Sequence, residues 1–342
     1  INPTSEIQYN NTNSCCNTTM APPLPASLIS TSSKSFSFLL PSINSSSPHV
    51  LVSFLLTNPV LNRTTIHEIG ADTSIKEVSE EPTRTLVHEY GGLSYGTLSE
   101  SLSTAFLSIL SPTTPPPATP LYIGSVFHPT SKDSPYTSCL LGLPPSSSPP
   151  SNLVLAAGKF ASYTEGVYHG VNGVYAVAEV PPPSPSDASS KPGEVVNKIV
   201  HLSPSPNGIV SRDVATGHDF YDCPSYDPES CFLYYKSWDH PNMPWDDTSL
   251  CRTSANQGEG EGVEEVITRG YSLYDVKVTE GADGRSLLTM IAEVEETFML
   301  YYIDLSKPVS ASSVVRVSGQ GEGWDLSKGD MGWSLGVGNS TG

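Results

Sequence analysis

The sequence predicts an all-β protein, a β-propeller built from four-stranded blades. Short apolar runs alternate along the chain with turn-forming residues, and Pro (31 residues) and Gly (27 residues) are abundant. Charged residues make up only 15% of the chain, and no long segment has the sustained apolar period of an amphipathic helix. Many short strands joined by Pro- and Gly-rich turns are typical of all-β folds. Because a propeller grows by adding blades, 342 residues can form one such domain.

A unit of several strands recurs in order along the chain. Copies begin near residues 160, 224 and 275, and their clearest strands are expected at 173–178, 231–235, 287–292 and 299–305. The copies are longer than the about 40–50 residues of a typical propeller repeat. Pro- and Ser-rich insertions explain the excess, and we expect them to form surface loops at 112–120, 144–150 and 181–193.

The two ends of the chain do not follow this pattern. Residues 1–20 are polar and end at the first methionine, Met20, and they lack the apolar core of a signal peptide. We expect them to be a disordered extension and residues 21–342 to be the propeller portion. The strands suffice for about five blades, and no closing strand is evident in the Gly-rich segment 319–342. The sequence therefore predicts an incomplete propeller, a fragment with an unpaired edge.

Composition excludes several function classes. The formal net charge of −18 disfavours a nucleic-acid partner, which needs clustered Lys and Arg. No apolar run reaches the about 18 residues of a membrane-spanning helix. The six cysteines form no C-x-x-C pair, so their spacing predicts neither a zinc site nor a dense disulfide framework. A reducing, cytoplasmic location is the expectation that follows.

Two segments are distinctive. Segment 237–246, with the sequence SWDHPNMPWD, follows the apolar run 232–236. It is too rich in proline for a helix interior or a central strand, and too aromatic for an ordinary solvated loop. We therefore expect a rigid turn at the end of a strand, with both Trp238 and Trp245 buried. The second segment, 84–92, has the sequence RTLVHEYGG.

Together with 219–221 (DFY) and 224–228 (PSYDP), these segments resemble the non-catalytic β-propeller of prolyl oligopeptidase-family serine peptidases. The acylaminoacyl or dipeptidyl peptidase-like branch is the most similar, and the resemblance covers most of residues 24–250. It implies a parent protein that cleaves short peptides through an α/β-hydrolase domain that is missing here. The propeller would then gate substrate access, and its partners would be that domain and the peptide substrates.

The resemblance also suggests which residues face the central cavity or the missing domain. The alternative for any one of them is a loop residue that only stabilises its blade. The candidates are Arg84, His88, Glu89, Tyr90, Trp238, Asp239, His240, Asn242, Trp245 and Asp246.

No catalytic residue is predicted in this chain, so whether it is itself an enzyme stays open. The family's nucleophile is the serine of a G-x-S-x-G elbow, with Asp and His following. The one formal match, at 332–336, contains Ser334, but the preceding 326–330 is polar and no helix-forming segment follows. No histidine lies after His240, so Ser334 has no downstream partner.

No metal or cofactor is predicted either. Asp239, His240 and Asp246 are of ligand type, and Asp219, Asp222 and His218 lie nearby in sequence. However, Pro241 and Pro244 constrain the backbone, and no regular ligand spacing on one element is present. We expect Asp239 or His240 to hold the turn by hydrogen bonds instead.

A second hypothesis is a stand-alone propeller, similar to TolB-like or WD-repeat proteins, that acts as an interaction scaffold. The coding sequence beyond Gly342 discriminates between the two, because only the peptidase continues into a hydrolase domain.

Overall fold

The computed structural model describes the strand-forming parts of the chain. These are residues 35–41, 50–58, 63–70, 72–79, 82–88, 93–110, 122–127, 136–141, 154–180, 195–256, 263–281, 283–294 and 297–317. The expected extension at 1–20 and the three expected insertions lie outside the described residues.

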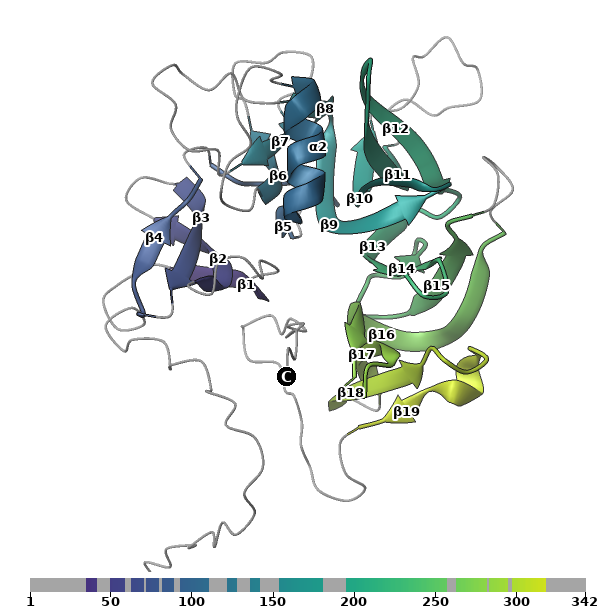
Figure 1. Cartoon of the computed structure of the whole chain (residues 1–342). Helices are drawn as coiled ribbons and strands as arrows, with labels where there is room; N and C mark the ends of the chain where they lie inside the picture. Colours follow the sequence, from purple (N-terminus) through teal and green to yellow (C-terminus); the bar gives the residue numbers. More distant parts are fainter. Residues whose placement is uncertain are drawn as a thin grey trace, which may run out of the picture.

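The first three sheets are antiparallel and follow chain order (Figure 1). The first contains β1 (Ser35–Pro41), β2 (Val50–Asn58), β3 (Arg63–Gly70) and β4 (Ile75–Glu77). The second contains β5 (Tyr95–Thr97), β6 (Tyr122–Phe127), β7 (Tyr136–Leu141) and β8 (Val154–Ala157). The third contains β9 (Lys159–Tyr168), β10 (Val171–Val180), β11 (Val196–Ser205) and β12 (Gly208–Ala215).

The last sheet has seven strands but consists of two four-stranded units. Its strands are β13 (Phe220–Asp227), β14 (Phe232–Trp238), β15 (Thr248–Ser254), β16 (Glu265–Glu280), β17 (Ser286–Val294), β18 (Thr297–Asp304) and β19 (Val315–Arg316). The long strand β16 belongs to both units. It pairs with β15 as far as Tyr271, and with β17 from Ser272 onward. Gly270, at a φ of 84°, lies at this junction, in a backbone region that favours glycine.

The four-stranded units are arranged around a common centre, with their first strands innermost (Figure 1). The first strands of successive units, β5, β9, β13 and β16, contact one another in chain order. This is the arrangement of propeller blades, so the predicted all-β, propeller-like fold is confirmed. None of the helices in the described part of the chain has the length and apolar character that crossing a membrane would need.

The core lies between adjacent units, and β14 shows why. Leu233 and Tyr235 are buried with residues of the third unit, including Val177. Tyr234, between them in sequence, is buried with residues of the fifth unit, including Leu288. Successive residues of a strand point to opposite faces. Because both faces of β14 are covered, its first four residues, 232–235, form a continuous apolar and aromatic run that does not alternate.

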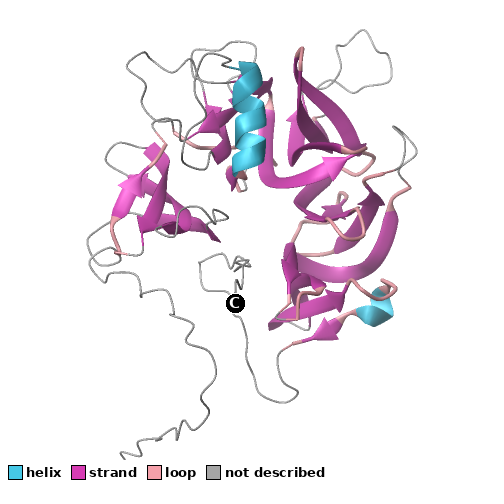
Figure 2. Cartoon of the chain, in the orientation of Figure 1, coloured by secondary structure: helices cyan, strands magenta, loops and turns pink. Residues whose placement is uncertain are grey.

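One helix departs from the sequence expectation. Helix α2 (Glu100–Leu110), the longer of the two cyan helices in Figure 2, follows β5 and precedes β6 in the chain. Its apolar face, Leu102, Phe106 and Leu107, is buried against residues of the second and third units. The side chain of Ser99 accepts a hydrogen bond from the Leu102 N–H at 3.4 Å, as an N-cap does. The helix has only 11 residues, which is too short for a sustained 3.6-residue apolar period, and the sequence therefore did not predict it.

Candidate functional site

The two distinctive segments of the sequence meet in space. The His88 ring lies 5.2 Å from the Trp238 ring and 5.5 Å from the Phe220 ring, edge-on to both. Phe220 and Trp238 are paired across β13 and β14, and their rings stack at 5.2 Å. The His240 ring lies 4.9 Å from Phe220. We call these four residues the aromatic cluster, and it is our candidate site.

His88 is held rigidly in this cluster. Its φ of 57° is uncommon for a residue other than glycine, and the residue is buried. Its backbone N–H donates to Glu179 Oε2 at 2.9 Å, and the other oxygen of the same carboxylate accepts a hydrogen bond from Lys159. Burial lowers the pKa of His88, so its ring is neutral at neutral pH.

The turn between β14 and β15 carries five of the predicted residues, Asp239, His240, Asn242, Trp245 and Asp246. The Asn242 N–H donates to the Asp239 carbonyl at 3.0 Å, and the Asp246 N–H to the Met243 carbonyl at 2.9 Å. The Asp246 side chain accepts from the Met243 N–H at 2.9 Å. The peptide bond between His240 and Pro241 is cis. The hydrogen bonds at Asn242, Met243 and Asp246 close a turn that includes residues 239–244, where the sequence predicts one.

The two tryptophans of this segment differ in exposure. Trp238 is 4% exposed, as predicted. The prediction that Trp245 is buried was wrong, because its exposure is 60%. Trp238 is the last residue of β14, where Phe220 of the neighbouring strand covers its ring. Trp245 lies beyond the strand, on the turn, where it presents a large apolar surface to solvent.

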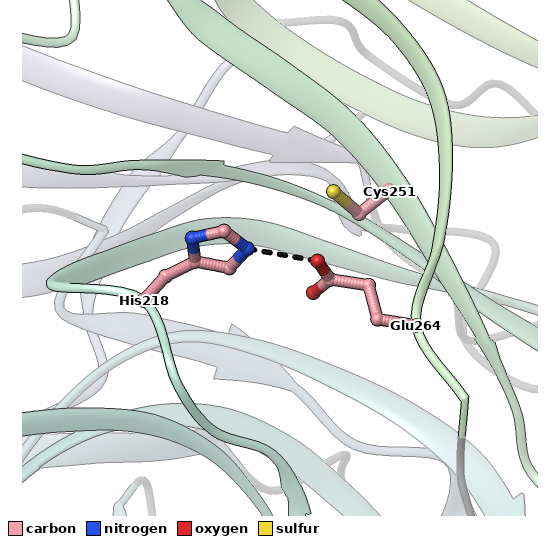
Figure 3. A group of neighbouring side chains, drawn as sticks. All are labelled: His218, Cys251 and Glu264. Carbon is pink, nitrogen blue, oxygen red and sulfur yellow. Dashed lines mark hydrogen bonds and ion pairs between the residues drawn. The ribbon is translucent and has the colours of Figure 1, made fainter.

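His218 joins this turn to two other strands. It follows Gly217, whose φ of 111° favours glycine, in the connection from β12 to β13. Its Nδ1 is 2.7 Å from Asp239 Oδ2, and its Nε2 is 2.8 Å from Glu264 Oε1 (Figure 3). The Tyr235 hydroxyl donates to the second oxygen of Glu264 at 2.8 Å. The hydrogen bond to Glu264 and that to Asp239 raise the pKa of His218 to about 9, so both ring nitrogens are protonated at neutral pH and donate.

Asp219 and Asp239 connect the same two segments. The Asp219 N–H donates to Asp239 Oδ1 at 2.8 Å. In return Asp219 Oδ2 accepts from the His240 backbone N–H at 2.9 Å and lies 3.0 Å from its Nδ1. Asp239 and His240 therefore hold the turn by hydrogen bonds, as the sequence indicated.

An ion pair between Lys236 and Asp222 lies beside the aromatic cluster. Lys236, which is 5% exposed, has its Nζ 3.3 Å from Asp222 Oδ2 and 5.7 Å from the Trp238 ring. The ammonium also donates to the carbonyls of Leu273 and Tyr274, at 3.3 and 3.1 Å. Asp222 Oδ1 accepts from the Ser162 hydroxyl at 2.6 Å. The pair thus joins the inner strands of the third, fourth and fifth units.

The other predicted residues are placed as follows. Arg84 is exposed, and its N–H donates to the Ser125 carbonyl of β6 at 2.9 Å. Glu89, Tyr90 and Ser334 lie outside the described residues. Phe220 and His218 were missed as candidates, although the sequence DFY beside the SWDHPNMPWD segment was a usable signal for Phe220.

Comparisons with known proteins support the fold. No protein-family model matches the chain, and no curated protein does. Among solved structures, a puromycin-hydrolyzing peptidase from Mycobacterium tuberculosis matches with a TM-score of 0.53 at 19% identity, over 83% of this chain and 39% of that chain. A puromycin hydrolase matches with a TM-score of 0.54 at 15% identity, over 87% and 41%.

The same hydrolase in its S511A form, complexed with PGG, gives a TM-score of 0.53 at 16% identity. The chain thus spans about two fifths of the length of the peptidases it matches. At these identities the likeness establishes the fold. The predicted likeness to the propeller part of a peptidase is therefore confirmed at the level of the fold.

The His218 contacts make stability depend on pH. The folded-state pKa of His218, about 9, lies above the reference value of 6.5. Its stabilisation is therefore fully present below about pH 6.5 and is lost as the pH rises through about 9. We expect the urea midpoint of the wild type to fall toward that of His218→Gln between about pH 6 and about pH 10. Because tyrosines and lysines also titrate in this range, the quantity to measure is the difference between the urea midpoints of the two proteins. If this difference is the same at both pH values, the raised pKa of His218 is contradicted.

Proposed function

We propose that this chain is the non-catalytic propeller part of a serine-type oligopeptidase, and that it controls the access of short peptides to a catalytic domain. The observation that carries the proposal is the match of 83–87% of this chain to only 39–41% of two puromycin-hydrolysing enzymes. The remainder of such an enzyme is long enough for an α/β-hydrolase domain. An acylaminoacyl or dipeptidyl peptidase-like specificity is part of the same proposal, and it is supported by the segments RTLVHEYGG and SWDHPNMPWD.

The exposed turn that carries Trp245, which the aromatic cluster supports from within, is the surface that we assign to the catalytic domain or to the substrate path. Trp245 supports this assignment, because it is 60% exposed on a turn fixed by internal hydrogen bonds. A rigid, exposed indole can bury a large area on docking at a small entropic cost. Asp239 and His240 stand at the base of the turn, both exposed, where they can offer charged partners. Arg84, Glu89, Tyr90 and Asn242 are further members of the proposed surface.

The chemistry would belong to the partner domain. Peptide cleavage of this type needs a serine nucleophile, a histidine base and an acid that orients the histidine, and it passes through an acyl-enzyme. This chain would instead exclude large substrates and fix the position of the catalytic domain. Cys223, Cys231 and Cys251 are free thiols, which supports the proposed reducing compartment.

The proposal predicts that purified residues 1–342 do not hydrolyse peptides. Aminoacyl-, acylaminoacyl- and dipeptidyl-fluorogenic substrates should be turned over no faster than in buffer. The Ser334→Ala variant, which removes the serine of the one formal elbow motif, serves as the matched control. Turnover by the wild type that disappears in Ser334→Ala would place catalysis in this chain and contradict the proposal.

The scaffold alternative makes a different prediction for the native protein. A stand-alone propeller would occur in cells without any hydrolase sequence on the same polypeptide. Mass spectrometry of the native polypeptide, captured with an antibody to residues 195–256, distinguishes the two. Peptides from a covalently continuous α/β-hydrolase domain support the peptidase, and their absence supports the scaffold.

A further inference from the structure

Three potential metal ligands converge beside the candidate site. The ligand atoms of His218, Cys251 and Glu264 all lie within 4.8 Å of one another. Figure 3 shows the imidazole and the carboxylate directed at each other, with the thiol beside them. His218 comes from the connection between β12 and β13, Cys251 from β15, and Glu264 from the residue before β16. Spacing along the sequence could not reveal this group, because each ligand comes from a different element.

The surroundings orient each ligand. Asp239 Oδ2 lies 2.7 Å from His218 Nδ1, which leaves Nε2 directed at the other two ligands. Histidines that bind metals commonly donate their second ring nitrogen to a carboxylate in this way. The Tyr235 hydroxyl holds one oxygen of Glu264 at 2.8 Å. Cys251 is fully buried, and its sulfur lies 3.4 Å from the Ser237 hydroxyl. The site is therefore built from oriented, partly desolvated groups.

The donor set selects the metal. One imidazole nitrogen, one sulfur and one carboxylate are the ligand types of zinc, whereas calcium and magnesium take oxygen ligands. Zinc sites with three protein ligands complete a tetrahedron with water. Bond lengths of about 2.0–2.3 Å separate two ligands on a tetrahedral zinc by roughly 3.3–3.6 Å. The 2.8 Å contact between His218 and Glu264 would therefore have to widen by about half an ångström to admit the ion.

We propose that His218 Nε2, Cys251 Sγ and Glu264 bind one Zn²⁺ ion, with water as the fourth ligand. On binding, the proton between His218 and Glu264 and the thiol proton of Cys251 pass to solvent, and three metal–ligand bonds form. The ion replaces the proton that joins the two side chains in the metal-free protein. The ion would link the connection between β12 and β13 to strand β15 and to the residue before β16. Asp239, which orients His218, also begins the turn that carries Trp245.

Titration calorimetry with ZnCl₂ on the chelator-treated chain at neutral pH tests this proposal. We expect one equivalent of zinc to bind, and Cys251→Ala to weaken binding at least ~10-fold. Cys231→Ala is the matched control, because Cys231 is also a free thiol but lies outside the group. This control should bind zinc as the wild type does. Glu264→Gln provides a second variant that removes one ligand while its amide can still hydrogen-bond.

Two further readouts do not depend on affinity. Cobalt bound in place of zinc should show the absorption of a thiolate–cobalt bond in the wild type and in Cys231→Ala, but not in Cys251→Ala. Zinc at about a hundredfold excess over its Kd should raise the melting temperature by roughly 5 °C in the same two proteins. Absence of zinc binding by the folded wild type overturns the proposal. Equal binding by Cys251→Ala and the wild type also overturns it, since the ion is then adventitious. Circular dichroism of each variant confirms that the proteins compared are folded.

Discussion

Replacement of Trp238 by alanine is expected to lower the free energy of unfolding by about 3–5 kcal/mol. The indole is 4% exposed, stacks on Phe220 at 5.2 Å and contacts His88 edge-on at 5.2 Å. Its removal takes away the apolar burial and leaves a cavity where residues from two distant segments meet. Because single domains are stable by only about 5–15 kcal/mol, this loss removes a large part of the total.

The measurement is urea unfolding followed by circular dichroism, with Trp245→Ala as the matched control. Both variants lose one indole from the same ten-residue segment, so their compositions are identical. Trp245 is 60% exposed, and we expect its replacement to change the stability by no more than about 0.5 kcal/mol. Similar losses in the two variants would contradict the assignment of one indole to the core and the other to the surface.

Replacement of Lys236 by methionine should destabilise the protein by about 3–5 kcal/mol. The ammonium is 5% exposed and neutralises Asp222, at 3.3 Å, while it also donates to two carbonyls of β16. Methionine keeps most of the side-chain volume but leaves the carboxylate without its cation. The cost therefore comes from the uncompensated charge of Asp222 and from the loss of two hydrogen bonds to the Leu273 and Tyr274 carbonyls, rather than from a cavity.

A double-mutant cycle with Asp222→Asn isolates this charge term. Asparagine keeps an oxygen that can accept a hydrogen bond from Ser162. The stability lost in the double variant should therefore be smaller than the sum of the losses in the two single variants. Lys307→Met is the control, since Lys307 is 67% exposed and its pairing with Asp304 should contribute no more than about 1 kcal/mol. Additivity of the Lys236 and Asp222 substitutions would show that the pair is not coupled.

Strands were predictable wherever both faces are covered by neighbouring units. The expected strands at 231–235 and 287–292 correspond to β14 (Phe232–Trp238) and β17 (Ser286–Val294). Each of these two strands contains a short, predominantly apolar run, so local sequence identifies it. The long strand β16 was expected only from about residue 275 onward. Its first half was missed because membership in two units depends on pairing with β15 and β17, which local sequence does not encode.

The site was predictable in parts. His88, Trp238 and His240 were selected because their segments are unusual, but their meeting depends on how the units pack. Trp245 was expected to be buried because aromatic residues usually are, yet its position on the turn places it beyond the strands that could cover it. His218 was noted as a ligand-type residue but not selected as a site residue, because its partners, Asp239 and Glu264, lie 21 and 46 residues away in sequence.

The central claim is that this chain serves a serine peptidase without supplying its nucleophile. Labelling of the native protein in its source cells with a fluorophosphonate probe tests this claim most directly, because the probe modifies an activated serine. Capture with an antibody to residues 195–256, followed by mapping of the modified peptide, identifies that serine. We predict that the label lies in a G-x-S-x-G peptide on the same polypeptide, outside residues 1–342. A label on Ser334, or no label on any polypeptide that contains this chain, would contradict the account.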